Sequence, residues 1–99
     1  MEIIKTVNEE GMNIALVGRL DTTTAPDLEK DARESLNGVK ELVFDFENLE
    51  YISSAGLRVL LAIQKMLGDA GAMKVTNAND IVKEVFEVTG FSDILTIEQ

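Results

Sequence analysis

Two adjacent serines, Ser53 and Ser54, are the residues of this sequence whose type and position best suit chemistry. They stand in YISSAGLRVLL, where an expected strand and loop lead into a run of large apolar residues. At the start of a helix the free backbone N–H groups point outward, and this geometry favours an anion. Serine is among the best N-cap residues, so capping explains one serine of the pair. The second serine is less well explained by capping.

The composition argues against a catalytic serine. The chain has no histidine to act as the general base and no cysteine to act as a thiol nucleophile or metal ligand. A lysine base would have to be Lys65, about three helical turns from the serines. No glycine-rich phosphate loop precedes the helix, which argues against nucleotide binding of that type. We therefore expect a protein that is not an enzyme, holds no cofactor and has a serine modified by another protein's active site.

The charge of the chain narrows its possible partners. Eighteen acidic and nine basic residues give a formal net charge of −9, which repels nucleic acid. The apolar runs are far shorter than the ~20 residues that cross a bilayer, and the N-terminus lacks the features of a signal peptide. We expect one cytoplasmic domain over residues 1–99 that binds no nucleic acid and does not insert into membranes.

The strand patterns predict a sheet. An opening hairpin is predicted by EIIKTV and IALVGRL, which flank a glycine-containing turn, and a buried strand by Lys40 to Phe46. AMKVTNA predicts a further strand, and the closing FSDILTIEQ predicts a short turn followed by an edge strand. With three intervening helices the order is β-β-α-β-α-β-α-β. This order predicts a single α/β domain with a mixed, mostly parallel sheet of about five strands and helices packed on it.

Capping and stop residues in the sequence predict where the first and third helices begin and end. The first takes Thr23 or Thr24 as its N-cap, has Pro26 in its first turn and stops at Asn37-Gly38. The third has Asn79 as its N-cap and Gly90 as its stop. Their periodicity predicts a buried stripe of Leu28, Ala32 and Leu36 on the first helix and an apolar side of Ile81, Val82, Val85 and Phe86 on the third.

The helix after the serines, from Ser54 to Leu67, has a wider apolar arc than one sheet face requires. Leu57 and Leu61 lie outside the main apolar arc, beside the charged stripe of the helix that contains Arg58. Either neighbouring helices cover these leucines, or they help to form a docking surface for another protein. Gly56 is costly inside a helix, which indicates close approach of the protein's own sheet or of a partner.

Three motifs together resemble the STAS domain over essentially the whole chain. They are G-x-L-D-x-x-T at Gly18 to Thr24, the hydrophobic-D-x element near Asp45, and S-[SAT]-G-L at Ser54 to Leu57. Among STAS proteins, a stand-alone chain of this length resembles the bacterial anti-sigma factor antagonists. The resemblance implies binding of an anti-sigma factor that is also a serine kinase, release when this kinase phosphorylates one serine, and resetting by a PP2C-type phosphatase.

The same resemblance assigns residues. It places the phosphoacceptor on Ser54, with Ser53 as the alternative, and the loop aspartate near the acceptor on Asp21. Ser53 stands where the best-known members have aspartate, and of the two serines we expect Ser53 to be the N-cap. The residues expected to contact the partner are Asp21, Thr22, Thr23, Ser53, Ala55, Gly56, Leu57, Arg58 and Leu61.

Other interpretations also fit the sequence. Asp21 and Thr22 to Thr24 also suit simple loop and capping roles. At the level of function, the main alternative is a STAS subunit that regulates or scaffolds a transporter or a stress-sensing complex without a serine kinase. A sensor of a nucleotide or a lipid is the third possibility.

Overall fold

The computed structural model describes residues 1–9, 11–68, 71–93 and 96–98. The described elements follow the order β1 (Glu2–Val7), β2 (Gly11–Leu20), α1 (Ala25–Ser35), β3 (Glu41–Asp45), β4 (Leu49–Ile52), α2 (Ser54–Leu67), β5 (Ala72–Thr76), α3 (Asp80–Thr89), the 3-10 helix η1 (Phe91–Asp93) and β6 (Thr96–Glu98). Parts of three predicted turns, at residues 10, 69–70 and 94–95, and the C-terminal residue 99 lie outside the described residues.

The sheet is mixed and mostly parallel, as predicted. Its strand order is β1-β2-β3-β5-β6, with β4 paired to β2 beside that path. The β1–β2 pair is antiparallel and all other described pairs are parallel. The single α/β fold predicted from the sequence is therefore confirmed.

The described sheet has six strands where the sequence predicts about five, because β4 lies in the segment expected to be a loop before α2. The long strand β2 pairs first with β3 and then, further along its length, with β4. Its residues 11–15 pair with β3 and its residues 18–20 pair with β4, with a register shift at Gly18 and Arg19. Gly18 has φ +105°, a conformation that glycine adopts at little cost. A strand of four residues that pairs only with a distant segment leaves little local pattern to detect.

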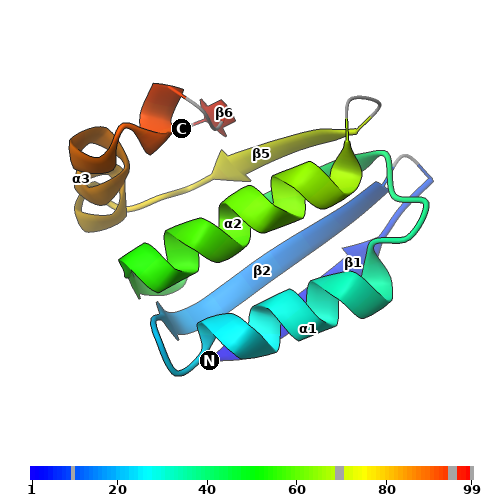
Figure 1. Cartoon of the computed structure of the whole chain (residues 1–99), viewed down its shortest axis with the longest axis horizontal. Helices are drawn as coiled ribbons and strands as arrows, with labels where there is room; N and C mark the ends of the chain where they lie inside the picture. Colours follow the sequence, from blue (N-terminus) through cyan, green and yellow to red (C-terminus); the bar gives the residue numbers. More distant parts are fainter. Residues whose placement is uncertain (10, 69–70, 94–95, 99) are drawn as a thin grey trace.

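Helices α1 and α2 lie side by side on one face of the sheet (Figure 1), and α3 packs against β4 and η1. Alternate residues of the central strands point under these helices, including Ile14, Leu16, Phe44 and Val75, and all four side chains are fully buried. The stripe on α1 predicted from the sequence is buried as well. The core therefore lies between α1, α2 and the sheet, and it fixes how α2 begins.

The helix ends confirm most of the predicted signals. Asn79 caps α3 by accepting a hydrogen bond from the Val82 N–H at 2.8 Å, and Gly90 closes the helix in the left-handed conformation. Ile81 is a correction: it is 57% exposed, so it does not belong to the buried side of α3 that holds Val82 and Phe86. Position 81 precedes the buried Val82 and turns outward in the first turn of this amphipathic helix.

Thr24 occupies the N-cap position of α1, but its side chain does not cap the helix. Its hydroxyl donates to the Arg19 carbonyl at 2.9 Å and accepts from the Asp21 N–H at 2.9 Å. Thr24 therefore ties the end of β2 to the loop before α1. Within the described part of the chain, no helix is long and apolar enough to cross a membrane.

Candidate functional site

Two loops that are far apart in the sequence meet where β2 and β4 end. In the parallel pair, Leu20 lies opposite Ile52. The Ser53 N–H then donates to the Leu20 carbonyl at 2.9 Å. This bond continues the pairing by one residue, so the loop that starts at Asp21 and the serines that start α2 lie next to each other. The tertiary structure thus brings together the two loop segments that the sequence analysis selected.

Ser53 is the N-cap of α2, as predicted. Its backbone is extended, with φ −97° and ψ 174°, and its side-chain oxygen accepts a hydrogen bond from the Gly56 N–H at 3.3 Å. Aspartate and serine are equally good N-caps. The serine that stands where an aspartate was expected therefore preserves this structural role.

Ser54 is the first residue of α2, and its side chain is exposed. Across residues 1–9, 11–68, 71–93 and 96–98, the structure gives no hydrogen bond to the Ser54 hydroxyl. One serine of the pair is thus engaged in capping, while the other has an exposed hydroxyl at the positive end of a helix dipole. The arrangement suits the attachment of an anionic group to Ser54.

Gly56 resolves one of the alternatives left open by the sequence. A Cβ atom at this position would lie 2.7 Å from Leu20 Cγ and 2.9 Å from Ile52 Cγ1. Both distances are shorter than ordinary van der Waals contact. The glycine is therefore required by the close approach of α2 to β2 and β4. Gly56 is buried against the protein's own sheet, which corrects the prediction that it contacts a partner.

Leu57 corrects the predicted docking surface. Its side chain is 2% exposed and belongs to the core, so it offers no contact to a partner. Helix α2 packs against α1 as well as the sheet, and this second neighbour accounts for the wider apolar arc. Ala55 and Leu61 are half-buried, and Arg58 is exposed. Within α2, the accessible part of the predicted surface is therefore Arg58, with partial contributions from Ala55 and Leu61.

The loop before α1 is built around the carboxylate of Asp21. Asp21 Oδ1 accepts from the Thr23 hydroxyl at 2.7 Å, from the Thr23 N–H at 3.0 Å and from the Thr24 N–H at 3.2 Å. The hydrogen bond from the Thr23 hydroxyl, together with the two backbone donors, lowers the pKa of Asp21 below its ordinary value of 3.8. Thr22 and Thr23 are exposed. The loop therefore holds a fixed negative charge beside the serines.

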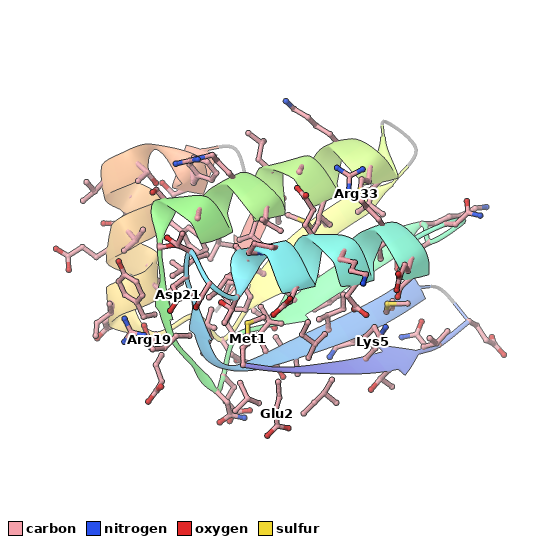
Figure 2. All side chains as sticks on the ribbon, turned by 60° about the horizontal axis from the view of Figure 1, so that its bottom comes forward. Met1, Glu2, Lys5, Arg19, Asp21 and Arg33 are labelled. Atoms are coloured by element: carbon pink, nitrogen blue, oxygen red, sulfur yellow. The ribbon has the colours of Figure 1, made fainter. Side chains whose placement is uncertain are left out.

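Arg19 and Tyr51 were not selected by the sequence analysis. They lie opposite each other in the β2–β4 pair, and the Arg19 guanidinium carbon lies 4.7 Å from the centre of the Tyr51 ring. Arg19 Nε is also 3.8 Å from Asp21 Oδ2. At an exposed site such a cation–π contact stabilises by about 0.5–1 kcal/mol. Because β4 was not predicted, no sequence signal placed Tyr51 next to Arg19. Figure 2 shows Arg19 and Asp21 at the same end of the molecule.

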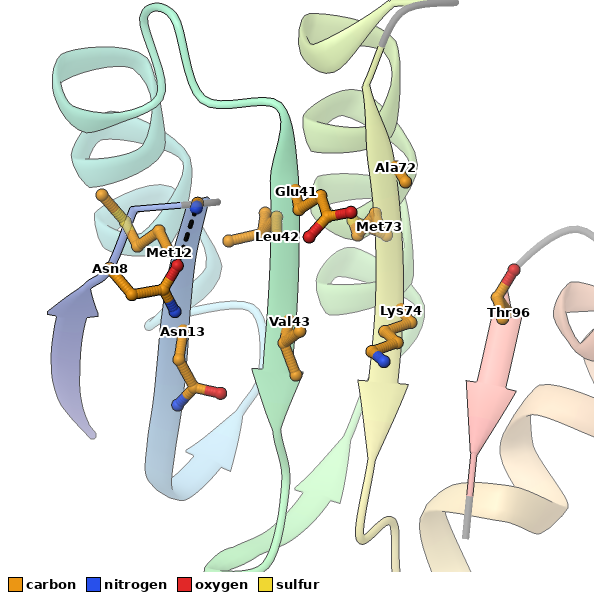
Figure 3. A pocket seen from close by; sticks show the side chains of 11 residues that line it. Asn8, Met12, Asn13, Glu41, Leu42, Val43, Ala72, Met73, Lys74 and Thr96 are labelled. Carbon is orange, nitrogen blue, oxygen red and sulfur yellow. Dashed lines mark hydrogen bonds between the residues drawn. The ribbon is translucent and has the colours of Figure 1, made fainter.

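One hollow lies away from the serines, and neither Ser53 nor Ser54 lines it. It is an open depression of about 410 Å³ over β2, β3 and β5, on the sheet face turned away from the helices (Figure 3). Asn13, Val43 and Lys74 are among the residues that line it. In the described ranges, no cluster of three or more acidic residues, histidines or cysteines could hold a metal ion.

Comparison with known proteins identifies the family. The STAS domain profile matches residues 2–99. The chain belongs to the STAS domain family. BtrV of Bordetella bronchiseptica, described as a putative anti-sigma factor antagonist, is 37% identical over 91 residues, which cover 89% of this chain and 78% of BtrV. An anti-sigma-B factor antagonist of Staphylococcus aureus is 24% identical over 101 aligned positions, which cover 100% of this chain and 94% of that protein.

Two solved structures of SpoIIAA show the same fold. The anti-sigma factor antagonist SpoIIAA in its unphosphorylated form superimposes with a TM-score of 0.76 at 20% identity, covering 99% of this chain and 88% of that one. The phosphorylated form of SpoIIAA, from Bacillus, gives a TM-score of 0.75 at 20% identity, with coverages of 99% and 92%. With its 37% identity to BtrV, this STAS protein belongs to the anti-sigma factor antagonist family, whose members are non-enzymatic regulators.

Proposed function

We propose that this STAS domain binds an anti-sigma factor through the surface around the start of α2 and is released when that factor, acting as a serine kinase, phosphorylates Ser54. The single observation that carries the choice of Ser54 is the division between the two serines. Ser53 Oγ accepts the capping hydrogen bond from the Gly56 N–H, whereas the side chain of Ser54 is exposed. A kinase reaches the second hydroxyl without breaking the start of the helix.

A phosphate on Ser54 is compatible with the fold. The group adds a charge of about −1.5 to −2 at neutral pH. It would lie at the first residue of α2, where the helix dipole favours an anion by about 0.3–1 kcal/mol. The domain itself should therefore stay folded after phosphorylation.

The same phosphate is incompatible with a complex that buries this surface. The neighbouring Asp21 is ionised, and the whole chain carries a net charge of −9, so the partner surface must accommodate negative charge already. Burying an additional dianion without a matching group costs several kcal/mol. Each 1.4 kcal/mol weakens binding about tenfold. Phosphorylation would therefore dissociate the complex while leaving the domain intact.

The direct experiment incubates the purified protein with the anti-sigma factor kinase of the same organism and Mg-ATP, and maps the phosphate by mass spectrometry. We expect one phosphate on Ser54 of the wild type and no phosphate on the Ser54→Ala variant. The matched control, Ser53→Ala, should still be phosphorylated on Ser54. Phosphate found on Ser53 alone would show that Ser53, and not Ser54, is the phosphoacceptor. Label only outside residues 53 and 54, or none at all, would refute the phosphorylation switch.

Resetting requires a phosphatase that acts on the exposed phosphoserine. A PP2C-type enzyme is the proposed class, and its substrate would be the phosphorylated domain. Treatment of the purified phosphoprotein with such a phosphatase should return the unmodified mass and restore binding to the anti-sigma factor. Recovery of the mass without recovery of binding would show that the phosphate is not what blocks the complex.

A further inference from the structure

Arg19 is held in one position on the surface by two neighbours. Its guanidinium lies over the ring of Tyr51, 4.7 Å from the ring centre, while its Nε faces Asp21 Oδ2 at 3.8 Å. Tyr51 is fixed by β4, and Asp21 is fixed by donors from Thr23 and Thr24. A long side chain at 58% exposure would otherwise sample many rotamers, so these contacts preorganise it.

The outer end of this guanidinium is open. Nε and the ring face are used within the protein, but over the described ranges no hydrogen bond engages the two terminal nitrogens of Arg19. A guanidinium with both terminal nitrogens available binds a carboxylate with two parallel hydrogen bonds. Arginine and tyrosine are also the residue types, with tryptophan, that most often dominate binding energy at protein interfaces.

The pair lies close to the serines. Arg19 and Tyr51 face each other one register step before Leu20 and Ile52, and the next step is the bond from the Ser53 N–H to the Leu20 carbonyl. With a rise of about 3.3 Å per strand residue, the pair lies roughly 7 Å from Ser53 along the strands. Leu20 and Ile52 are fully buried, so the alternate positions 19 and 51 point to the opposite side of the strands.

We propose that Arg19, positioned by Tyr51 and Asp21, is a binding residue for the partner and receives an aspartate or glutamate side chain of the anti-sigma factor. This inference rests on the proposed function, since it assigns a second contact to the same interface. It extends the interface from the start of α2 across the ends of β2 and β4. Leu57 is buried and adds nothing to this interface.

The charge of the protein supports a carboxylate as the occupant. A chain with a net charge of −9 suits a partner surface that is mostly positive. The Arg19 guanidinium, at the edge of the interface, would repel that surface unless the partner places an acidic residue opposite it. One matched carboxylate at this point would fix the register of the complex and exclude partners that lack it. Arg19 would thus determine specificity for one anti-sigma factor over others.

The test compares Arg19→Gln with Arg33→Gln as the matched control. Arg33 is 64% exposed and also faces an acidic residue at 3.8 Å, but it lies in the last turn of α1, away from Asp21 (Figure 2). Dissociation constants for the unphosphorylated proteins and the anti-sigma factor are measured by calorimetry without nucleotide, and folding is checked by urea denaturation. We expect Arg19→Gln to weaken binding about tenfold to thirtyfold and Arg33→Gln to leave it unchanged.

Two further measurements separate the causes. Tyr51→Phe keeps the aromatic ring and should bind like the wild type, whereas Tyr51→Leu removes the ring and should weaken binding in the same direction as Arg19→Gln. Repeating the series with a non-hydrolysable ATP analogue tests whether a nucleotide phosphate is the occupant. A loss with Arg19→Gln that occurs only in the presence of the analogue would overturn the assignment to a protein carboxylate.

Binding of the wild-type protein to the anti-sigma factor separates failure of the proposed function from failure of the role proposed for Arg19. If the wild type does not bind the anti-sigma factor, the proposed function fails. If the wild type binds and Arg19→Gln binds equally well while both are folded, the proposed function stands and the role of Arg19 is refuted.

Discussion

The Ser53 N–H donates to the Leu20 carbonyl at 2.9 Å, and this one bond joins the two halves of the candidate site. It continues the parallel pairing of β2 and β4 into the first residue before α2. Asp21 follows Leu20 directly, so the fixed carboxylate and the exposed hydroxyl of Ser54 belong to the same small surface. A change at either segment is therefore expected to affect the other.

The capping role of Ser53 predicts a difference between two substitutions. Ser53→Ala removes the acceptor for the Gly56 N–H, and we expect it to lower the free energy of unfolding by about 0.5–2 kcal/mol. Ser53→Asp keeps an acceptor of the same quality and should stay within about 0.5 kcal/mol of the wild type. Urea denaturation measures both values. Equal losses in the two variants would contradict the capping role.

Gly56→Ala should destabilise the domain even though alanine is the better helix former. Alanine gains up to about 1 kcal/mol in helix propensity. Its Cβ would, however, lie 2.7 Å from Leu20 Cγ, and overpacking of this kind costs about 1–3 kcal/mol. We expect a net loss of about 1 kcal/mol in urea denaturation. The control is Gly56→Ala combined with Leu20→Ala: the loss caused by alanine at 56 should shrink or reverse in that background, and an unchanged loss would rule out the steric cause.

Asp21 predicts a dependence of stability on acid pH. Its pKa is lowered in the folded state by the hydrogen bond from the Thr23 hydroxyl, so the unfolded state binds a proton at higher pH than the folded state does. The stabilisation is therefore complete above the ordinary value of 3.8 and is lost as the pH falls through the lower, folded value. The stability difference between wild type and Asp21→Asn should shrink as the pH falls through and below 3.8.

Urea midpoints measured along this pH series test the prediction, and Thr23→Val is the control. Valine keeps the shape of threonine but removes the hydroxyl donor to Asp21 Oδ1. The pH-dependent difference between this variant and its Asp21→Asn double variant should be smaller than in the wild-type background. A difference that is constant over the pH range would show that Asp21 has the same pKa in both states.

Ser54→Asp should separate stability from binding. A negative charge at the first residue of α2 is expected to leave the free energy of unfolding unchanged or to raise it by up to about 1 kcal/mol. Binding to the anti-sigma factor should weaken, although by less than with phosphate, because aspartate carries only part of the phosphate charge. Ser54→Ala should bind like the wild type and resist release by the kinase and ATP. An Asp variant that binds as tightly as the wild type would show that charge at Ser54 is not the switch.

The sequence alone determined the features that depend on neighbouring residues. The bounds of α2, from Ser54 to Leu67, were predicted correctly, as were the N-cap roles of Ser53 and Asn79. An N-cap joins residues only three positions apart, and a helix repeats every few residues, so both leave a pattern in a short stretch of sequence. The order of most strands followed from the same kind of pattern.

Only the tertiary structure decided which residues share a surface. The strand β4 exists because β2 offers it a free edge beyond Gly18, and this non-local pairing placed Tyr51 against Arg19 and Ser53 beside Leu20. It also decided that Leu57 is buried, since the packing of α1 on α2 covers an arc that the helix periodicity left open. Strand pairing and helix packing join residues that are distant in sequence, and the partners of such contacts are not encoded in any short segment.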